Sequence, residues 1–94
     1  MTQVAMHYMG AFSRLVGLAD EQYILPRSAT LRDLIAAIHG RHREMPQGTL
    51  LAGDGALSPL VVFMVQGIVC RHLDAPLGDG ASVSVMALTP AVGG

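Results

Sequence analysis

The sequence contains no lysine and no tryptophan, and its only cysteine is Cys70. A single cysteine cannot form a disulfide within the chain, and no second cysteine is present to build a zinc site with it. The six basic residues are all arginines scattered along the chain, and the net charge is -1. The sequence therefore has no basic stripe for a phosphate backbone, which argues against nucleic acid as a partner.

Long hydrophobic runs are absent as well. The longest apolar run, residues 60–65, is far too short to cross a bilayer. The first residues lack the basic segment and the long apolar stretch of a secretory signal. We therefore expect a cytoplasmic protein with no membrane-spanning segment and no membrane partner.

The residues that are present describe one small packed domain. The 94 residues are 51% hydrophobic and 14% charged, which is too apolar and too weakly charged for a disordered chain. A chain of this length supports a single core, and we place one domain at residues 1–94.

The clearest predicted element is a helix that begins at Leu31. Thr30 and Asp33 have the spacing of a capping box, in which each side chain binds the backbone amide of the other residue. Basic residues at positions 39 and 41–43 then crowd the negative end of the predicted helix. The apolar residues between these ends form one stripe, namely Leu31, Leu34, Ile35 and Ile38.

Strands are predicted on both sides of this helix. The patterns indicate strands at residues 4–9, 21–25, 60–66, 68–70 and 82–88, with tight turns at 66–67 and 78–80. Residues 60–66 are apolar on both alternating faces, which is typical of a central strand covered on both sides. Residues 11–17 fit one turn of helix or a packed loop. Residues 45–59 are predicted to form a loop with a brief turn near Leu50. This order predicts an α+β fold, a mixed sheet of four to five strands packed on one main helix.

The chain ends in two glycines. Pro90 closes off the last predicted strand, so we interpret residues 89–94 as a flexible tail. Gly93 and Gly94 have no side chains, so this backbone could pass through a channel too narrow for a Cβ atom and present an unhindered carboxylate. The alternative is that a chain end simply tolerates glycine.

Several short motifs occur in a defined order along the chain. They are Phe12-Ser13-Arg14-Leu15-Val16-Gly17, Thr30-Leu31-Arg32-Asp33-Leu34, Val65-Gln66-Gly67, Ala75-Pro76-Leu77-Gly78-Asp79-Gly80 and Gly93-Gly94. In this order they resemble the ubiquitin-like sulfur carriers, the small subunit of molybdopterin synthase and the thiamine sulfur carrier (MoaD/ThiS). The resemblance runs from Val4 to the last residue and implies a β-grasp fold. The ending Thr89-Pro90-Ala91-Val92-Gly93-Gly94 departs from the Pro-Pro-Val-x-Gly-Gly type common in the family.

The resemblance implies that the protein is a cosubstrate with no catalytic site of its own. In the family, an ATP-dependent adenylyltransferase of the MoeB/ThiF type converts the terminal carboxylate into an acyl adenylate. A persulfide sulfur then displaces AMP and leaves a thiocarboxylate, which supplies sulfur to an acceptor enzyme such as the large subunit of molybdopterin synthase. Gly94 would be the reacting residue and Gly93 would give it clearance. ATP is used by the partner, so we expect no tightly bound cofactor and no metal site in this chain.

Two further features bear on the pathway and on conjugation. The long loop at residues 44–59 is closer to the molybdopterin type than to the shorter thiamine carrier, which slightly favours the former. The absence of lysine means that no lysine isopeptide chain can form on this protein, which disfavours ubiquitin-like chain building.

The predicted sheet is more apolar than one helix can cover. An uncovered apolar face of this kind generally marks a protein interface. We predict that this surface and the tail bind the partner through Val62, Met64, Met86, Leu88, Pro90 and Val92. The alternative is that the loop at residues 44–59 folds over the same face.

The remaining candidate residues have simpler interpretations. Cys70 lies in an apolar strand, where an inert buried thiol is expected rather than a sulfur relay. His39 and His42 are one turn apart, but no carboxylate or cysteine with ligand spacing joins them, so we interpret them as cations at a helix end. Asp54 and Asp79 lie in Gly-Asp-Gly sequences, which indicates turn formation rather than ion binding.

Two rival functions remain. The first is a β-grasp interaction module that only docks on a partner, with an incidental Gly-Gly end. The second is an enzyme in its own right, but the sequence offers no convergent set of polar residues for one.

Overall fold

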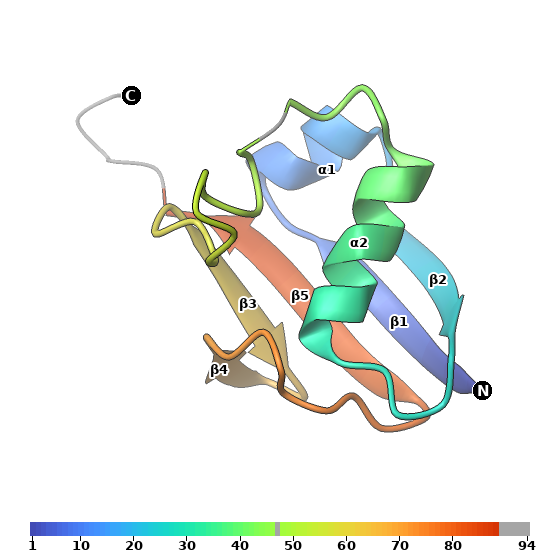
Figure 1. Ribbon diagram of the computed structural model, residues 1–94. Helices are drawn as coiled ribbons and strands as arrows, with labels where there is room; N and C mark the ends of the chain where they lie inside the picture. The colour runs from blue at the N-terminus through green and yellow to red at the C-terminus, as the bar shows by residue number, and fades with distance from the viewer. Residues whose placement is uncertain (47, 89–94) are drawn as a thin grey trace.

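The computed structural model describes residues 1–46 and 48–88. Its elements are β1 (Thr2–Tyr8), α1 (Ala11–Val16), β2 (Asp20–Leu25), α2 (Leu31–Arg41), β3 (Val61–Val65), β4 (Ile68–Cys70) and β5 (Ala81–Ala87). The strands form one sheet in the order β2-β1-β5-β3-β4, and α2 lies across one face of it (Figure 1). The predicted mixed sheet on one main helix is confirmed. None of the helices in the described ranges is long and apolar enough to span a membrane.

The two central strands run parallel although they lie at opposite ends of the chain. The β1–β5 register runs from Val4 opposite Ala81 to Tyr8 opposite Val85. β2 pairs antiparallel with β1, and β3 pairs antiparallel with both β5 and β4. Because β1 and β5 share a direction, the chain leaves β5 at the end of the sheet where β1 leads into α1 (Figure 1). The predicted tail at residues 89–94 lies outside the described residues.

Helix α2 begins where the capping box predicts. The Asp33 carboxylate accepts a hydrogen bond from the Thr30 amide at 2.8 Å, and the Thr30 hydroxyl accepts one from the Asp33 amide at 3.4 Å. These two bonds satisfy amide groups that the helix itself cannot pair. All four residues of the predicted apolar stripe are fully buried. Local sequence therefore determines both where α2 begins and which side of it packs.

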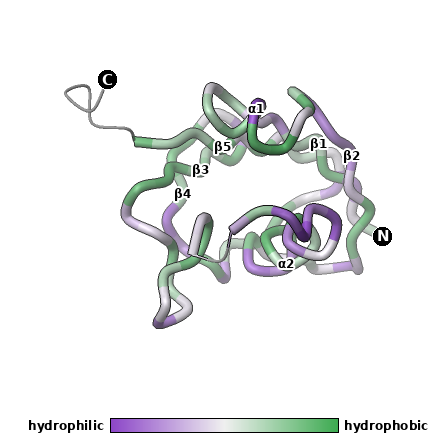
Figure 2. The backbone as a smooth tube through the Cα atoms, turned by 90° about the horizontal axis from the view of Figure 1, so that it is seen from above, coloured by the Kyte–Doolittle hydropathy of each residue, from purple (hydrophilic) through white to green (hydrophobic). Residues whose placement is uncertain are grey.

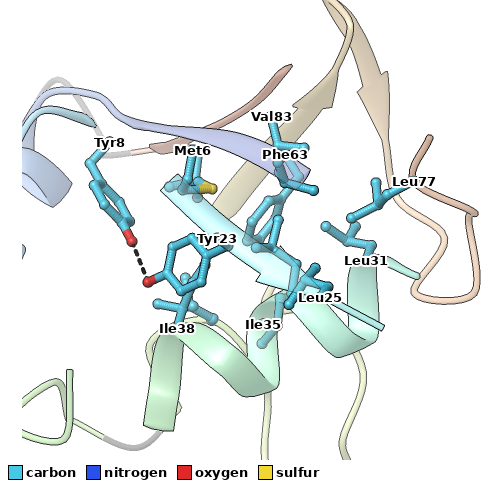
Figure 3. Close-up of a cluster of buried hydrophobic side chains, with 14 of the residues drawn as sticks. Met6, Tyr8, Tyr23, Leu25, Leu31, Ile35, Ile38, Phe63, Leu77 and Val83 are labelled. Atoms are coloured by element: carbon cyan, nitrogen blue, oxygen red, sulfur yellow. Dashed lines mark hydrogen bonds between the residues drawn. The ribbon is translucent and has the colours of Figure 1, made fainter. Parts of the chain in front are cut away.

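The core fills the space between the sheet and α2. Figure 2 shows the sheet and the helix as two layers, and Figure 3 shows the side chains that meet between them. Alternate residues of each strand point inward, among them Met6, Tyr23, Phe63 and Val83. The long loop after α2 adds Met45 and Leu50 to this same core.

The β3–β4 hairpin turns on two residues. Gln66 and Gly67 have φ values of 53° and 79°, the backbone of a two-residue hairpin turn. The Gln66 side-chain oxygen accepts a hydrogen bond from the Ser82 amide at 2.8 Å, which ties this turn to β5. The turn places Val69 opposite Met64.

One fold-level prediction is wrong. The sequence indicated that residues 60–66 form a strand covered on both faces. In the structure, only Val61 and Phe63 of β3 are buried, while Val62 and Met64 on the other face are half-buried. Helix α2 and the loop that follows it both pack on the inner face, which leaves Val62 and Met64 on the outer face partly exposed.

Candidate functional site

The sheet face opposite α2 carries an apolar surface over β3, β4 and the end of β5. Val62 lies directly opposite Met86 on β5, and Met64 lies opposite Val69 on β4. Leu60 and Leu88 continue the same alternation just beyond the strands, and the Leu88 amide donates to the Leu60 carbonyl at 2.7 Å. We refer to these six residues, Leu60, Val62, Met64, Val69, Met86 and Leu88, as the apolar sheet surface.

This surface is substantially open to solvent. Leu60, Val69 and Leu88 are 62%, 56% and 49% exposed, and the other three members are half-buried. Large aliphatic side chains clustered at such exposure are typical of a protein interface. The surface lies where the chain leaves β5, so a partner bound there would also be near the start of the C-terminal segment.

Four of the predicted partner-binding residues lie together on this surface: Val62, Met64, Met86 and Leu88. The other predicted site residues, Pro90, Val92, Gly93 and Gly94, lie outside the described residues. The partner-binding role of all of them stays a prediction.

Sequence reasoning missed Leu60 and Val69. Leu60 has the same parity as Val62 and Met64, so extending the alternation by one step would have found it. Val69 could have been found from the two-residue turn at Gln66-Gly67, because that turn determines which residue of β4 faces Met64.

The alternative, that the loop at residues 44–59 covers this face, is wrong for the described part of the loop. Its buried side chains, Met45 and Leu50, join the cluster on the α2 side of the sheet. An isolated bridge between Leu51 and Leu57 folds the following segment back on itself. The loop therefore completes the inner core and leaves the outer face open.

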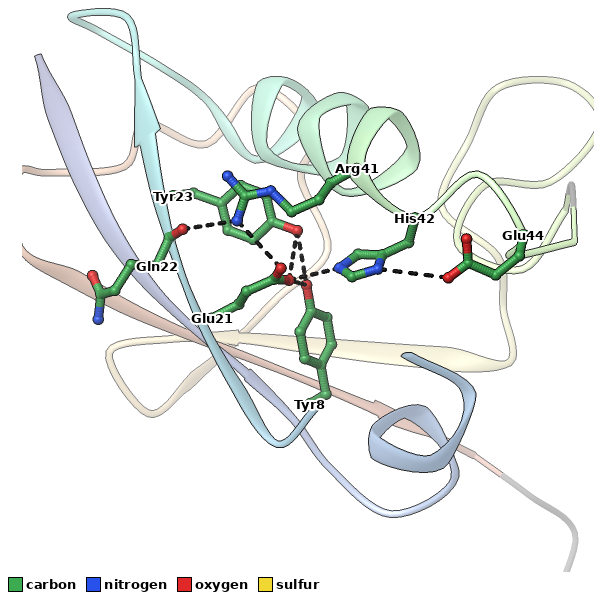
Figure 4. A network of polar contacts seen from close by, with 7 residues as sticks. All are labelled: Tyr8, Glu21, Gln22, Tyr23, Arg41, His42 and Glu44. Atoms are coloured by element: carbon green, nitrogen blue, oxygen red, sulfur yellow. Dashed lines mark hydrogen bonds and ion pairs between the residues drawn. The ribbon is translucent and has the colours of Figure 1, made fainter. Parts of the chain in front are cut away.

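A buried polar cluster joins the end of α2 to β1 and β2 (Figure 4). Its centre is the Glu21 carboxylate, which accepts a hydrogen bond from the Tyr8 hydroxyl at 2.7 Å and lies 2.7 Å from His42 Nε2. Arg41 approaches the second carboxylate oxygen at 3.3 Å and stacks 4.1 Å from the centroid of the Tyr23 ring. The cluster thus gathers residues from three elements around one carboxylate.

The hydroxyl groups of two tyrosines are hydrogen-bonded within this cluster. Tyr8 and Tyr23 lie 2.9 Å apart and both approach the same Glu21 oxygen, at 2.7 and 3.0 Å. Both hydroxyls are within donating distance of Glu21, and either one can donate across the Tyr8–Tyr23 contact, because each phenol has a single proton. Burial raises the pKa of Tyr8 strongly and that of Tyr23 to about 12. Both phenols therefore stay protonated at neutral pH.

Glu21 is ionised despite its low exposure. Burial by itself would raise its pKa, but hydrogen bonds from His42, Tyr8, Tyr23 and Arg41 together lower the pKa of Glu21 to about 2. Every buried side-chain polar atom in the described ranges has a hydrogen-bond partner. The polar groups of the cluster therefore bind one another, and their role is to hold the end of α2 against β1 and β2.

The structure corrects two single-residue predictions. Cys70 is half-buried rather than fully buried, with its side chain against the core. His42 is not a solvated cation at the helix end, because its side chain is 10% exposed and points at Glu21. The position of His42 at the helix end suggested an interaction with the helix dipole, but its contact with the buried Glu21 carboxylate is the stronger interaction.

The other polar candidates take the predicted structural roles. The Asp54 carboxylate accepts a hydrogen bond from the Ala56 amide at 3.0 Å, within its own turn. The Asp79 carboxylate accepts one from the Gln3 amide at 2.8 Å and ties the last turn to β1. Among the residues that the structure describes, no three His, Cys, Asp or Glu side chains gather as a metal site would require.

The strand order, the parallel central pair and the single helix across one face define a ubiquitin-like β-grasp protein. The model of the ThiS family matches residues 6–94. The chain therefore belongs to the ThiS family of ubiquitin-like sulfur carriers, as the ordered motifs predicted.

Solved structures agree with this fold. A protein from Pyrococcus furiosus, named as a candidate molybdopterin converting factor subunit 1, is 29% identical with a TM-score of 0.75, and the match covers 95% of this chain and 100% of that one. SAMP1 from Haloferax volcanii is 17% identical with a TM-score of 0.83, covering 98% and 99% of the two chains. The Amycolatopsis orientalis BexX/CysO complex contains a chain 16% identical with a TM-score of 0.72, covering 94% and 98%. The last two show the fold alone. No curated protein sequence matches this chain significantly.

Proposed function

We propose that the protein carries sulfur as a thiocarboxylate on Gly94 and donates it in the biosynthesis of a cofactor or metabolite. The observation that carries this proposal is the family match, which extends through the terminal Gly-Gly sequence. The molybdopterin type is slightly favoured by the long loop after α2. The name of the Pyrococcus furiosus protein supports the same choice.

The proposed chemistry takes place in two steps. The Gly94 carboxylate oxygen attacks the α-phosphate of ATP, a C–O–P linkage forms, and pyrophosphate leaves. A hydrosulfide ion then attacks the acyl carbon, a C–S bond forms, and AMP leaves with the original carboxylate oxygen. A persulfide donor delivers the same sulfur, provided that a thiol reduces the resulting acyl disulfide. A glycine at the terminus leaves both attacks unhindered because it has no Cβ atom.

The catalytic groups for these steps belong to partners. An adenylyltransferase of the MoeB/ThiF type supplies the ATP site, and an acceptor enzyme, such as a molybdopterin synthase large subunit, receives the sulfur. The apolar sheet surface suits docking of both, because Met64 and Met86 are adaptable side chains beside the start of the C-terminal segment. The two partners would then bind in turn rather than together.

The intact mass of the protein tests this proposal. The full chain is incubated with ATP, sulfide and a MoeB/ThiF-type adenylyltransferase already shown to activate its own carrier. We expect a mass gain equal to the replacement of one oxygen by one sulfur, and no gain in a variant that lacks Gly94. An unchanged mass for the full chain, with the enzyme active on its own carrier, would contradict the carrier function.

The alternative function is a docking module whose Gly-Gly end is incidental. Deleting Gly94 separates the two functions. A docking module without Gly94 would still bind its partner and would keep its whole function. A carrier without Gly94 would still bind its partner but could no longer transfer sulfur.

A further inference from the structure

A cleft of about 730 Å³ separates the end of α2 from the loop that follows it. His39 and Arg43 line it on the helix side. Leu51, Ala52 and Gly53 line it on the loop side. The volume lies in the range of pockets that hold small organic molecules. The cleft is on the α2 side of the protein, away from the apolar sheet surface.

The loop wall of the cleft is a well-formed hairpin. Leu51 and Leu57 make an isolated bridge, and the Ala52 amide donates to the Ala56 carbonyl at 2.7 Å. The Gly55 amide donates to the Ala52 carbonyl at 2.9 Å, which closes the hairpin. This wall is therefore held in place by its own backbone hydrogen bonds.

The ionisable groups that line the cleft are all bases. No carboxylate is among the described residues that line it. The nearest acids along the chain are engaged elsewhere, since Glu44 lies 3.8 Å from His42 Nδ1 and the Asp54 carboxylate binds the Ala56 amide. Within residues 1–46 and 48–88, Arg43 makes no ion pair, in contrast to Arg41 two residues earlier.

The rest of the lining is apolar or lacks a side chain. Met45 and Leu51 provide aliphatic surface, and Gly53 and Gly55 expose backbone close to the cleft. A guanidinium beside aliphatic surface matches a ligand with a planar or tetrahedral oxyanion on a small apolar body. We propose that this cleft binds a small organic oxyanion, a carboxylate or phosphate, with Arg43 as the charged contact and Leu51 and Ala52 against its apolar part.

Phenyl phosphate is the probe that tests this site. The full chain, labelled with ¹⁵N, is titrated and the amide shifts are followed, with benzyl alcohol and benzylamine as uncharged and cationic probes. We expect saturable shifts that cluster at His39, Arg43, Leu51 and Ala52 for phenyl phosphate only. Equal shifts from benzyl alcohol would overturn the requirement for an oxyanion.

Two variants separate the charged contact from the apolar one. Arg43→Gln should weaken phenyl phosphate binding about tenfold, because it removes a charge-assisted hydrogen bond. Ala52→Leu should weaken binding by crowding the apolar part of the ligand while Arg43 stays in place. Arg71→Gln is the matched control, because Arg71 is an exposed arginine that does not line the cleft. If Arg43→Gln binds as tightly as Arg71→Gln, or if shifts spread over all the arginines, the cleft is not the site.

Discussion

Glu21 Oε1 lies 2.7 Å from His42 Nε2, and the two side chains are 13% and 10% exposed. This contact joins the start of β2 to the residue that follows α2. It sets the position of the helix end against the sheet, because His42 cannot turn outward without leaving the carboxylate with fewer donors. Buried polar contacts of this kind stabilise only when every group is partnered, as it is here.

The Glu21 cluster predicts a specific loss of stability in acid. The pKa of Glu21 is lowered from 4.5 to about 2 in the folded protein, so the folded state favours the ionised form. The resulting stability, at most about 3 kcal/mol, is fully present above pH ~4.5 and is lost as the pH falls toward ~2. Urea unfolding of the wild-type protein at a series of pH values measures this loss.

Glu21→Gln is the control for this titration. The variant cannot ionise at this position, so we expect its free energy of unfolding to fall less steeply between pH ~4.5 and ~2. At pH 7 it should be less stable than wild type by about 1–3 kcal/mol, because the donors around this side chain lose a charged acceptor. Parallel curves for the two proteins across the acid window would show that Glu21 does not carry the pH dependence.

Arg41 is predicted to protect the free edge of β2. The Tyr8 amide donates to the Ala19 carbonyl, so the backbone groups of Gln22 point away from β1 toward the open edge. Arg41 occupies that edge by donating to the Gln22 carbonyl at 3.0 Å. An uncovered edge of this kind pairs readily with another chain. We expect Arg41→Ala to self-associate as concentration rises, measured by sedimentation velocity.

Arg32→Ala is the matched control for the edge prediction. Arg32 is on the same helix, and its partner is the exposed Asp74 rather than a strand edge. This variant should stay at the wild-type association state. Arg41 does not protect the edge of β2 if the two variants self-associate equally. The same conclusion holds if Arg41→Ala stays monomeric at every concentration.

The apolar sheet surface is predicted to bind the adenylyltransferase. Met86→Asp places a charge at the centre of the surface, beside Val62. We expect adenylation at subsaturating concentrations to slow at least about tenfold, with the thermal unfolding midpoint close to wild type. Gln22→Asp is the control, since it adds the same charge to an exposed position of β2, the strand at the far edge of the sheet. Equal rates for the two variants would place the docking surface elsewhere.

Gly94→Ala tests the steric requirement at the reacting carboxylate. The added methyl group should slow activation about a hundredfold, because a small displacement of the reacting atom misaligns it with ATP. Thr89→Ser in the same segment serves as the control and should react at the wild-type rate. Circular dichroism should show both variants folded. Activation of Gly94→Ala at the wild-type rate would contradict a narrow channel around the terminus.

Much of the fold could be predicted from the sequence because its signals are local. The Thr30 and Asp33 pair and the following apolar stripe place α2 within a few residues. The turn at Gln66-Gly67 likewise defines the β3–β4 hairpin, since its positive φ values suit a two-residue turn. The family motifs, including Gly93-Gly94, are also local sequences, so the amino-acid sequence alone is enough to recognise the ThiS family.

The tertiary structure decided the features that depend on residues distant in the chain. The parallel pairing of β1 with β5 joins the two ends of the chain, and no local pattern specifies it. The β3–β5 and β3–β4 pairings bring Leu60, Val69 and Leu88 to one surface, and the packing of α2 against β2 turns His42 inward to Glu21. The physical reason is that burying a polar side chain such as that of His42 costs free energy unless it forms a hydrogen bond. The packing of the whole chain determines which group is close enough to form that bond.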